Sequence, residues 1–188
     1  MNKLYIGISG KMGSGKTTLS SGIIDAMSEP VARISMATPI KDLQDTIYKE
    51  LGMELEGEKD RDLLIALGMW GRGKDADFWL NQAIQRASKL MGTQIIICDD
   101  IRFENEAKWF KENGILMRIN GEQRGPNVDH NTQNVTETAL DNFPFDYYID
   151  NRVPEEDMIM SALYCIAQHL NVSKETIDSI AQELHKEA

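Results

Sequence analysis

The chain has 188 residues, of which 41% are hydrophobic and 27% are charged, a balance typical of a globular domain. No apolar stretch approaches the length of a membrane span and no signal peptide is visible, so we expect a cytoplasmic protein. The net charge of −10 argues against an extended nucleic-acid surface, which needs a basic face. It does not oppose a small phosphate-bearing substrate. Cys98 and Cys165 predict two buried, reduced thiols and no zinc site.

Strand and helix patterns alternate along the chain, as expected for a parallel sheet covered by helices. Apolar runs predict strands at residues 3–8, 31–35, 94–98, 115–119 and 147–149. Apolar residues at helical spacing predict helices at 16–27, 39–51, 63–70, 80–91, 103–113 and 155–170, with a last helix after Ser173. Residues 70–74 read as a basic turn between helices. Trp70, Phe78 and Trp79 are expected in the core.

Residues 10–17 read GKMGSGKT and match the phosphate-binding pattern G-x-x-x-x-G-K-[ST] between a strand and a helix. Glycines allow positive φ, so successive N–H groups face a phosphate at the N-terminus of the helix. Lys16 is expected to bridge the β- and γ-phosphates, and Thr17 to offer its hydroxyl to Mg²⁺. The predicted phosphate-binding residues are Gly10, Gly13, Ser14, Gly15, Lys16, Thr17 and Thr18.

A second constellation, Asp99-Asp100-Ile101-Arg102, closes an apolar strand. One of the two carboxylates is expected to hold Mg²⁺ directly or through water, or to orient the acceptor phosphate. Arg102 is expected to grip a phosphate with two hydrogen bonds. The alternative is a simple helix start, with Arg102 paired to Glu106 on the surface.

Two inserts interrupt the sheet, the helical region 37–92 and the polar loop 120–142. The remaining segments, 1–36, 93–119 and 144–188, form the core of a single predicted P-loop domain. Two inserts beside a P-loop are typical of a small-molecule kinase with an acceptor clamp and a lid. The chain has no N-K-x-D motif, which counts against a GTPase switch protein.

Single arginine and lysine side chains in these inserts, or next to them, are candidates for binding phosphate. Arg118 and Arg124 flank the start of the long loop and are predicted to act from a lid. Arg72 and Lys41 are candidates for binding the acceptor's phosphate. For each cation the alternative is a solvated surface side chain. His130 is expected to be an ordinary loop histidine.

Taken together, these residues resemble the deoxynucleoside monophosphate (dNMP) kinases of tailed phages, and they are similar also to animal-type phosphomevalonate kinase. The resemblance is carried by residues 10–17, 37–42, 67–68, 78–79, 100–102, 124–125, 136–137, 140–143 and 146–151, together with Arg72. It implies an α/β fold with a five-stranded parallel sheet of the nucleoside monophosphate kinase type. It also implies that Arg72 and Arg102 bind acceptor and transferring phosphates and that Asn151 lies near the adenine. Thr17 stands where both families often carry Asp.

We therefore expect an ATP- and Mg²⁺-dependent kinase that converts a dNMP to its diphosphate, with Lys16, Asp100, Arg102 and Arg124 catalytic. One alternative is a kinase with another acceptor, a phosphorylated metabolite or a modified base in DNA. Another is a non-catalytic module switched by nucleotide. The expected partners are small nucleotides, with a second copy of the chain as a further candidate, in the host cytoplasm if the protein is phage-encoded. The accepted base is not evident, although Phe78 or Tyr48 would be placed to exclude a 2′-hydroxyl.

Overall fold

The computed structural model describes residues 3–57, 59–124 and 138–171. It divides into two compact units, residues 1–33 with 93–188, here called the sheet unit, and residues 34–92, here called the helical unit. The sequence-based predictions for His130, for residues 136–137 and for a helix after Ser173 fall outside the described residues.

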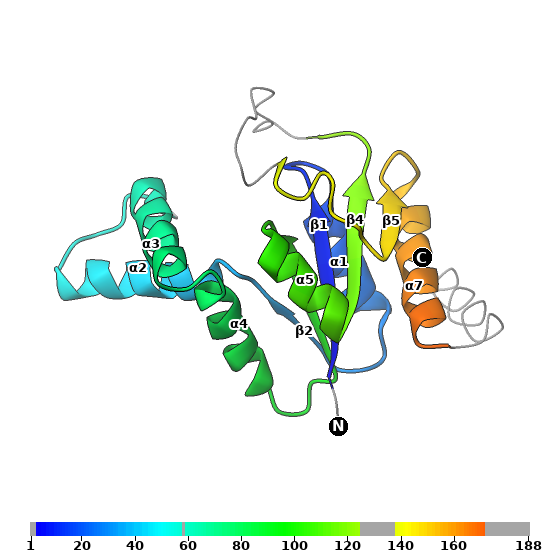
Figure 1. The fold of residues 1–188 in the computed structure, drawn as a ribbon, viewed down its shortest axis with the longest axis horizontal. Coiled ribbons are helices and arrows are strands. Elements are labelled where there is room, and N and C mark those ends of the chain that lie inside the picture. Colours follow the sequence, from blue (N-terminus) through cyan, green and yellow to red (C-terminus); the bar gives the residue numbers. More distant parts are fainter. Residues whose placement is uncertain (1–2, 58, 125–137, 172–188) are drawn as a thin grey trace. The chain divides into compact units, whose positions relative to one another are not determined.

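A five-stranded parallel sheet carries the sheet unit, as predicted (Figure 1). Its strands are β1 (Leu4–Gly10), β2 (Val31–Ile34), β3 (Ile95–Ile101), β4 (Gly114–Asn120) and β5 (Tyr147–Asp150), in the order β2-β3-β1-β4-β5. Leu4 pairs with Ile95 on one side of β1, and Tyr5 pairs with Gly114 on the other. Because β1 is central, the loop that follows it opens between the carboxyl ends of β3 and β4.

The two faces of the sheet follow the alternation of side chains along β1. Ile6 and Ile8 are fully buried in a core formed with α1 (Lys16–Ala26) and α7 (Glu155–His169). The opposite face is covered by α5 (Glu104–Asn113), as Figure 1 shows. On this face Tyr5 contacts the rings of Trp109 and Phe110. Gly7 allows this approach, since a Cβ there would lie 2.8 Å from the Phe110 ring.

The helical unit consists of α2 (Thr38–Glu50), α3 (Arg61–Lys74) and α4 (Phe78–Ser88). Pro39 occupies the first turn of α2, as predicted. The buried Gln44 accepts a hydrogen bond from the Asp60 N–H at 3.0 Å, and the Tyr48 hydroxyl donates to the Asp60 carboxylate at 2.8 Å. These bonds tie α2 to the N-terminus of α3, where Asp60 is the N-cap.

The prediction of a basic turn at residues 70–74 is wrong, because this segment is the last turn of α3. The helix continues because Gly68 and Gly71 pack against α4: the Trp79 indole donates to the Gly68 carbonyl at 3.0 Å, and a Cβ on Gly71 would lie 2.5 Å from that indole. Trp79 is buried as predicted, whereas Trp70 is 52% exposed. In the described ranges, no helix has the length and apolar character needed to cross a membrane.

Candidate nucleotide-binding site

The loop between β1 and α1 takes the conformation that its glycines were predicted to allow. Gly10, Gly13 and Gly15 have φ values of 157°, 73° and 90°, and Gly15 is the left-handed N-cap of α1. Any side chain on Gly10 would also place its Cβ 2.6 Å from the Ser14 hydroxyl. The loop therefore requires glycine for its backbone angles and, at position 10, for space.

Each carbonyl from Gly10 to Ser14 accepts a hydrogen bond. The Lys16 ammonium donates to the carbonyls of Gly10 and Lys11 at 2.6 and 2.7 Å. The carbonyls of Met12, Gly13 and Ser14 accept from the Gln123 amide, the Arg124 N–H and the Asn151 amide, at 3.1, 2.8 and 2.9 Å. In a planar trans peptide the carbonyl and the next N–H point in opposite directions. Fixing the carbonyls of residues 12 and 14 thus turns the N–H groups of Gly13 and Gly15 to the other side, the arrangement of an anion-binding nest.

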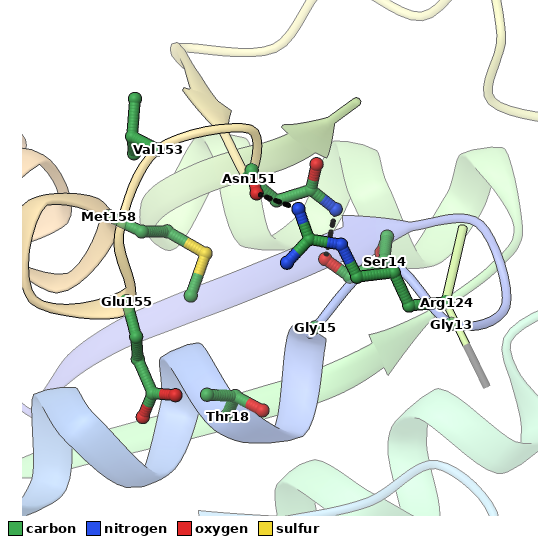
Figure 2. A pocket seen from close by; sticks show the side chains of 9 residues that line it. All are labelled: Gly13, Ser14, Gly15, Thr18, Arg124, Asn151, Val153, Glu155 and Met158. Atoms are coloured by element: carbon green, nitrogen blue, oxygen red, sulfur yellow. Dashed lines mark hydrogen bonds between the residues drawn. The ribbon is translucent and has the colours of Figure 1, made fainter. Parts of the chain in front are cut away.

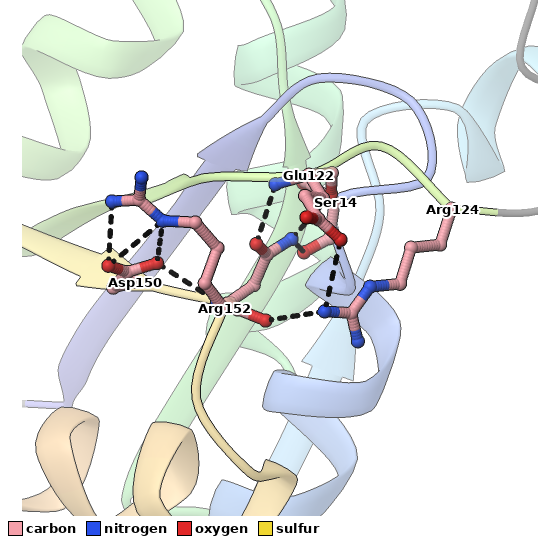
Figure 3. Close-up of polar contacts among 6 residues, drawn as sticks. Ser14, Glu122, Arg124, Asp150 and Arg152 are labelled. Carbon is pink, nitrogen blue, oxygen red and sulfur yellow. Dashed lines mark hydrogen bonds and ion pairs between the residues drawn. The ribbon is translucent and has the colours of Figure 1, made fainter.

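Asn151 connects Ser14 of this loop to Glu122 in the segment that follows β4, and Figure 3 shows Ser14 and Glu122 close together. The buried Asn151 amide donates to the carbonyls of Ser14 and Glu122 and accepts from the Glu122 N–H at 2.8 Å. These bonds occupy both the donor and the acceptor sides of the amide, so Asn151 supports the loop rather than presenting a free edge to a base. Gly121, which sequence reasoning missed, has φ 128°, and its Cβ would lie 2.0 Å from the Asn151 oxygen.

A cavity of 320 Å³ lies beside the loop (Figure 2). It is lined by residues of the loop, of α1, of the segment after β4, of the turn before α7 and of the start of α7: Gly13, Ser14, Gly15, Thr18, Arg124, Asn151, Val153, Glu155 and Met158. The Arg124 guanidinium reaches over the loop and donates to the Asn151 carbonyl at 3.2 Å. Within the described residues, the buried Ser14 hydroxyl has no hydrogen-bond partner. A buried hydroxyl without a partner is typical of a site in which a polar ligand supplies the missing hydrogen bond.

Arg118 differs from the predicted lid arginine. It lies in β4 with only 10% of its side chain exposed, and its guanidinium donates to the Leu140 carbonyl at 2.9 Å and to the Asp141 carboxylate at 2.5 Å. The same carboxylate lies 3.6 Å from the Lys11 ammonium in the phosphate loop. Arg118 therefore anchors the described end of the predicted lid. Arg124, with 63% of its side chain exposed, is the arginine next to the cavity.

The two aspartates of β3 point to opposite faces of the sheet. Asp99 lies on the α1 face, where it accepts from the Ser20 hydroxyl at 2.6 Å and lies 3.7 Å from the Arg33 guanidinium. The Ser20 hydroxyl also donates to the Thr17 carbonyl, so Asp99 is linked to the start of α1. Asp100 accepts from the buried Cys98 thiol at 3.1 Å. Burial and the Asp100 charge raise the pKa of that thiol well above its ordinary value.

The remaining predicted site residues divide between the two units. Arg102 is exposed just before α5, and its N–H donates to the Glu106 carboxylate, so the alternative contact with Glu106 occurs through the backbone. Lys41 lies in the first turns of α2 and Arg72 in the last turn of α3, both in the helical unit. Lys16, Arg102 and Arg124 belong to the sheet unit.

The family described as phosphomevalonate kinase matches residues 8–115, more than half of the chain. The chain belongs to this family. The matched residues include the phosphate loop, the helical unit and the end of β3 with Arg102. Membership of the phosphomevalonate kinase family supports a phosphotransferase. No curated protein matches the sequence.

Solved structures share the fold of this family member at low sequence identity. A gluconokinase from Sinorhizobium meliloti has a TM-score of 0.51 and 13% identity, over 98% of this chain and 97% of its own. A shikimate kinase from Aquifex aeolicus has a TM-score of 0.51 and 12% identity, over 86% and 95%. TT1252 from Thermus thermophilus has a TM-score of 0.54 and 18% identity, over 90% and 99%. The fold is therefore that of a P-loop kinase.

Proposed function

We propose that this protein transfers the γ-phosphoryl group of ATP to the 5′-phosphate of a dNMP, with Mg²⁺. The observation that carries the phosphoryl-transfer part is the phosphate loop, whose carbonyls are all engaged and whose glycines aim N–H groups at an anion. The dNMP acceptor rests on the sequence resemblance to phage kinases. A soluble nucleotide kinase of this type acts in the cytoplasm, that of the host if the gene is phage-borne.

In the proposed transfer, an oxygen of the acceptor phosphate attacks the γ-phosphorus of ATP. The bond between the γ-phosphorus and the β–γ bridging oxygen breaks, and ADP is released. Lys16 exchanges its bonds to the Gly10 and Lys11 carbonyls for phosphate oxygens and neutralises charge that develops between them. Arg124 lines the cavity beside the loop and is suited to cover the bound triphosphate from the predicted lid.

The Mg²⁺ site follows from the residues around the start of α1. The Thr17 hydroxyl is exposed in the first turn of the helix, and Asp99 is linked to the same turn through Ser20. Mg²⁺ usually keeps several waters and takes few protein ligands besides phosphate oxygens, which suits a hydroxyl plus a carboxylate acting through water. When bound, Mg²⁺ offsets phosphate charge. Asp100, on the other face of β3, is then assigned to the acceptor side with Arg102.

Phosphomevalonate is a second candidate acceptor, and the family match favours it. Both acceptors present a phosphate, so Arg72, Arg102 and Lys41 serve either of them as cations. The two differ beyond the phosphate, since one carries a flat nucleobase and the other a short aliphatic chain. The choice between them therefore depends on the groups that surround the rest of the acceptor.

An ADP-release assay with saturating ATP tests the proposal across the dNMPs, the ribonucleoside monophosphates and phosphomevalonate. We expect at least one dNMP to raise the rate about 100-fold or more above the rate without acceptor. Stimulation by phosphomevalonate alone would transfer the assignment to the second candidate. Slow ATP hydrolysis that no acceptor changes would indicate a nucleotide-switched module instead.

A further inference from the structure

The helical unit contains a groove of 350 Å³ that the phosphate-binding motif does not explain. It lies between α2 and α4 and is closed on one side by the end of α3, and all of its lining residues belong to this unit: Pro39, Asp42, Leu43, Thr46, Trp70, Phe78, Trp79, Gln82 and Arg86. Its volume falls within the range of small-molecule sites, and its mixture of aromatic and few polar groups is typical of them.

Aromatic rings form one end of the groove. Phe78 stands nearly perpendicular to Trp70, with ring centres 5.6 Å apart, and nearly perpendicular to Trp79, with ring centres 4.8 Å apart. The Trp79 indole N–H is engaged by the Gly68 carbonyl, so this ring is a fixed wall. Trp70 leaves half of its surface exposed. A flat ring placed here stacks on one aromatic face and meets the edge of another.

The polar groups of the groove are mostly paired. Arg86 forms an ion pair with Asp42 across α2 and α4, and the Thr46 hydroxyl donates to the Asp42 carbonyl at 2.7 Å. The half-buried Gln82 is different: in the described part of the helical unit, its side-chain amide makes no hydrogen bond. An amide presents a donor and an acceptor side by side, the complement of the edge of a nucleobase.

From this arrangement we propose that the groove binds the base of the acceptor nucleotide, with Trp70 and Phe78 as the stacking surface and Gln82 as the residue that reads the edge of the base. This inference rests on the proposed function and extends it, because it gives the helical unit a reason to prefer a nucleotide to an aliphatic phosphate. An aliphatic chain has no flat face to stack on Trp70 and no base edge to form hydrogen bonds with Gln82. The groove is thus a specificity site, separate from the cations that hold the phosphate.

The experiment measures KM and kcat for each dNMP in Gln82→Ala and Trp70→Ala. Gln85→Ala is the matched control, since Gln85 is an exposed glutamine on the same helix outside the groove, and Met69→Ala is the control on α3. We expect each groove variant to raise the acceptor KM about 10-fold, with kcat at saturation and the KM for ATP unchanged. Gln82→Ala should also reduce discrimination among the four bases. Both controls should match the parent protein.

Three results decide the matter. Unchanged acceptor KM values in an active dNMP kinase would overturn the groove and leave the proposed function intact. If no dNMP is phosphorylated, equilibrium dialysis with the same four dNMPs replaces kinetics. Binding that weakens in Gln82→Ala and not in Gln85→Ala would then support the groove although the proposed function has failed. Absence of dNMP binding would overturn both. Circular dichroism confirms that each variant is folded.

Discussion

The phosphate loop of the sheet unit and the groove of the helical unit recognise ligands in different ways. In the loop, five successive carbonyls are held by hydrogen bonds, and the groups left to face an anion are backbone N–H groups. The groove is built from side chains, with the half-exposed Trp70 ring, the partly buried Phe78 ring and the Gln82 amide, which makes no hydrogen bond in the described helical unit. Backbone recognition is common to every nucleoside triphosphate, whereas side-chain recognition selects among acceptors. A motif can therefore name the donor without naming the acceptor.

The largest effect that would test this comparison is expected for Lys16→Ala. Its ammonium is bound by the Gly10 and Lys11 carbonyls and is proposed to exchange them for phosphate oxygens, so its loss removes stabilisation of the transferring phosphoryl group. We expect kcat to fall about 10²–10³-fold with every acceptor. Steady-state ADP release at saturating ATP measures this. Lys11→Ala is the control in the same loop, because Lys11 pairs with Asp141 at the surface, and its kcat should stay within about 3-fold of the parent. Equal losses in both variants would contradict a specific role for Lys16.

Two glycine substitutions, one in each region, should differ in their cost in unfolding free energy and in the substrate whose KM they raise. Gly121→Ala combines a positive φ with a Cβ 2.0 Å from the Asn151 oxygen, so it should cost about 2–3 kcal/mol of unfolding free energy. It should also raise the KM for ATP, because Asn151 holds the Ser14 carbonyl. Gly71→Ala crowds the Trp79 indole but gains helix propensity, so its net cost should be smaller.

Gly71→Ala should raise the acceptor KM and leave the KM for ATP unchanged, the reverse of Gly121→Ala. Denaturant unfolding and two-substrate kinetics measure these effects. Gly73→Ala serves as the control, since nothing lies within 4 Å of its Cβ position in the last turn of α3, and it should stabilise the protein slightly. A rise in the KM for ATP in both Gly121→Ala and Gly71→Ala would mean that the two sites are not independent.

The two arginines predicted to act from the lid should have different effects, one on stability and the other on kcat. Arg118→Met removes buried hydrogen bonds to Leu140 and Asp141 and should cost about 1–3 kcal/mol of stability, with kcat within a few-fold of the parent. Arg124→Ala should leave stability nearly unchanged and lower kcat about 10-fold or more, since its exposed guanidinium lies beside the cavity. Thermal unfolding and ADP release distinguish them. A loss of stability in Arg124→Ala with normal kcat would reverse the assignment.

The sequence predicts the features that depend on local geometry and misses those that depend on distant contacts. The strands, the glycine conformations and the helix start at Lys16 were evident, because a short motif and an apolar run each depend on local geometry. The roles of Arg118 and Asn151 were not, since their partners lie 22 to 137 residues away. The helical end of α3 was missed because Gly71 and Gly73 are typical of a turn, and only the packing against Trp79 makes a glycine favourable at position 71. Gln82 carried no signal, as one amide on an amphipathic helix reads as surface.

The smallest expected effect concerns pH and a surface pair in each unit. Arg152 lowers the pKa of Asp150 to about 2, so this pair contributes above the ordinary pKa of 3.8, and its contribution is lost as the pH falls toward 2. In the helical unit, hydrogen bonds from the Leu63 N–H and, to a smaller extent, from the Tyr48 hydroxyl lower the pKa of Asp60, and the bond to Asp60 raises the pKa of Tyr48. The contribution of the Tyr48–Asp60 bond is therefore lost in acid through Asp60 and also in alkali, as the pH rises above 10 and Tyr48 ionises.

Melting temperatures of Arg152→Ala should approach those of the parent only in acid, while those of Tyr48→Phe should approach them at both extremes. Convergence of Arg152→Ala in alkali would show that the carboxylate of Asp150 is not the group responsible.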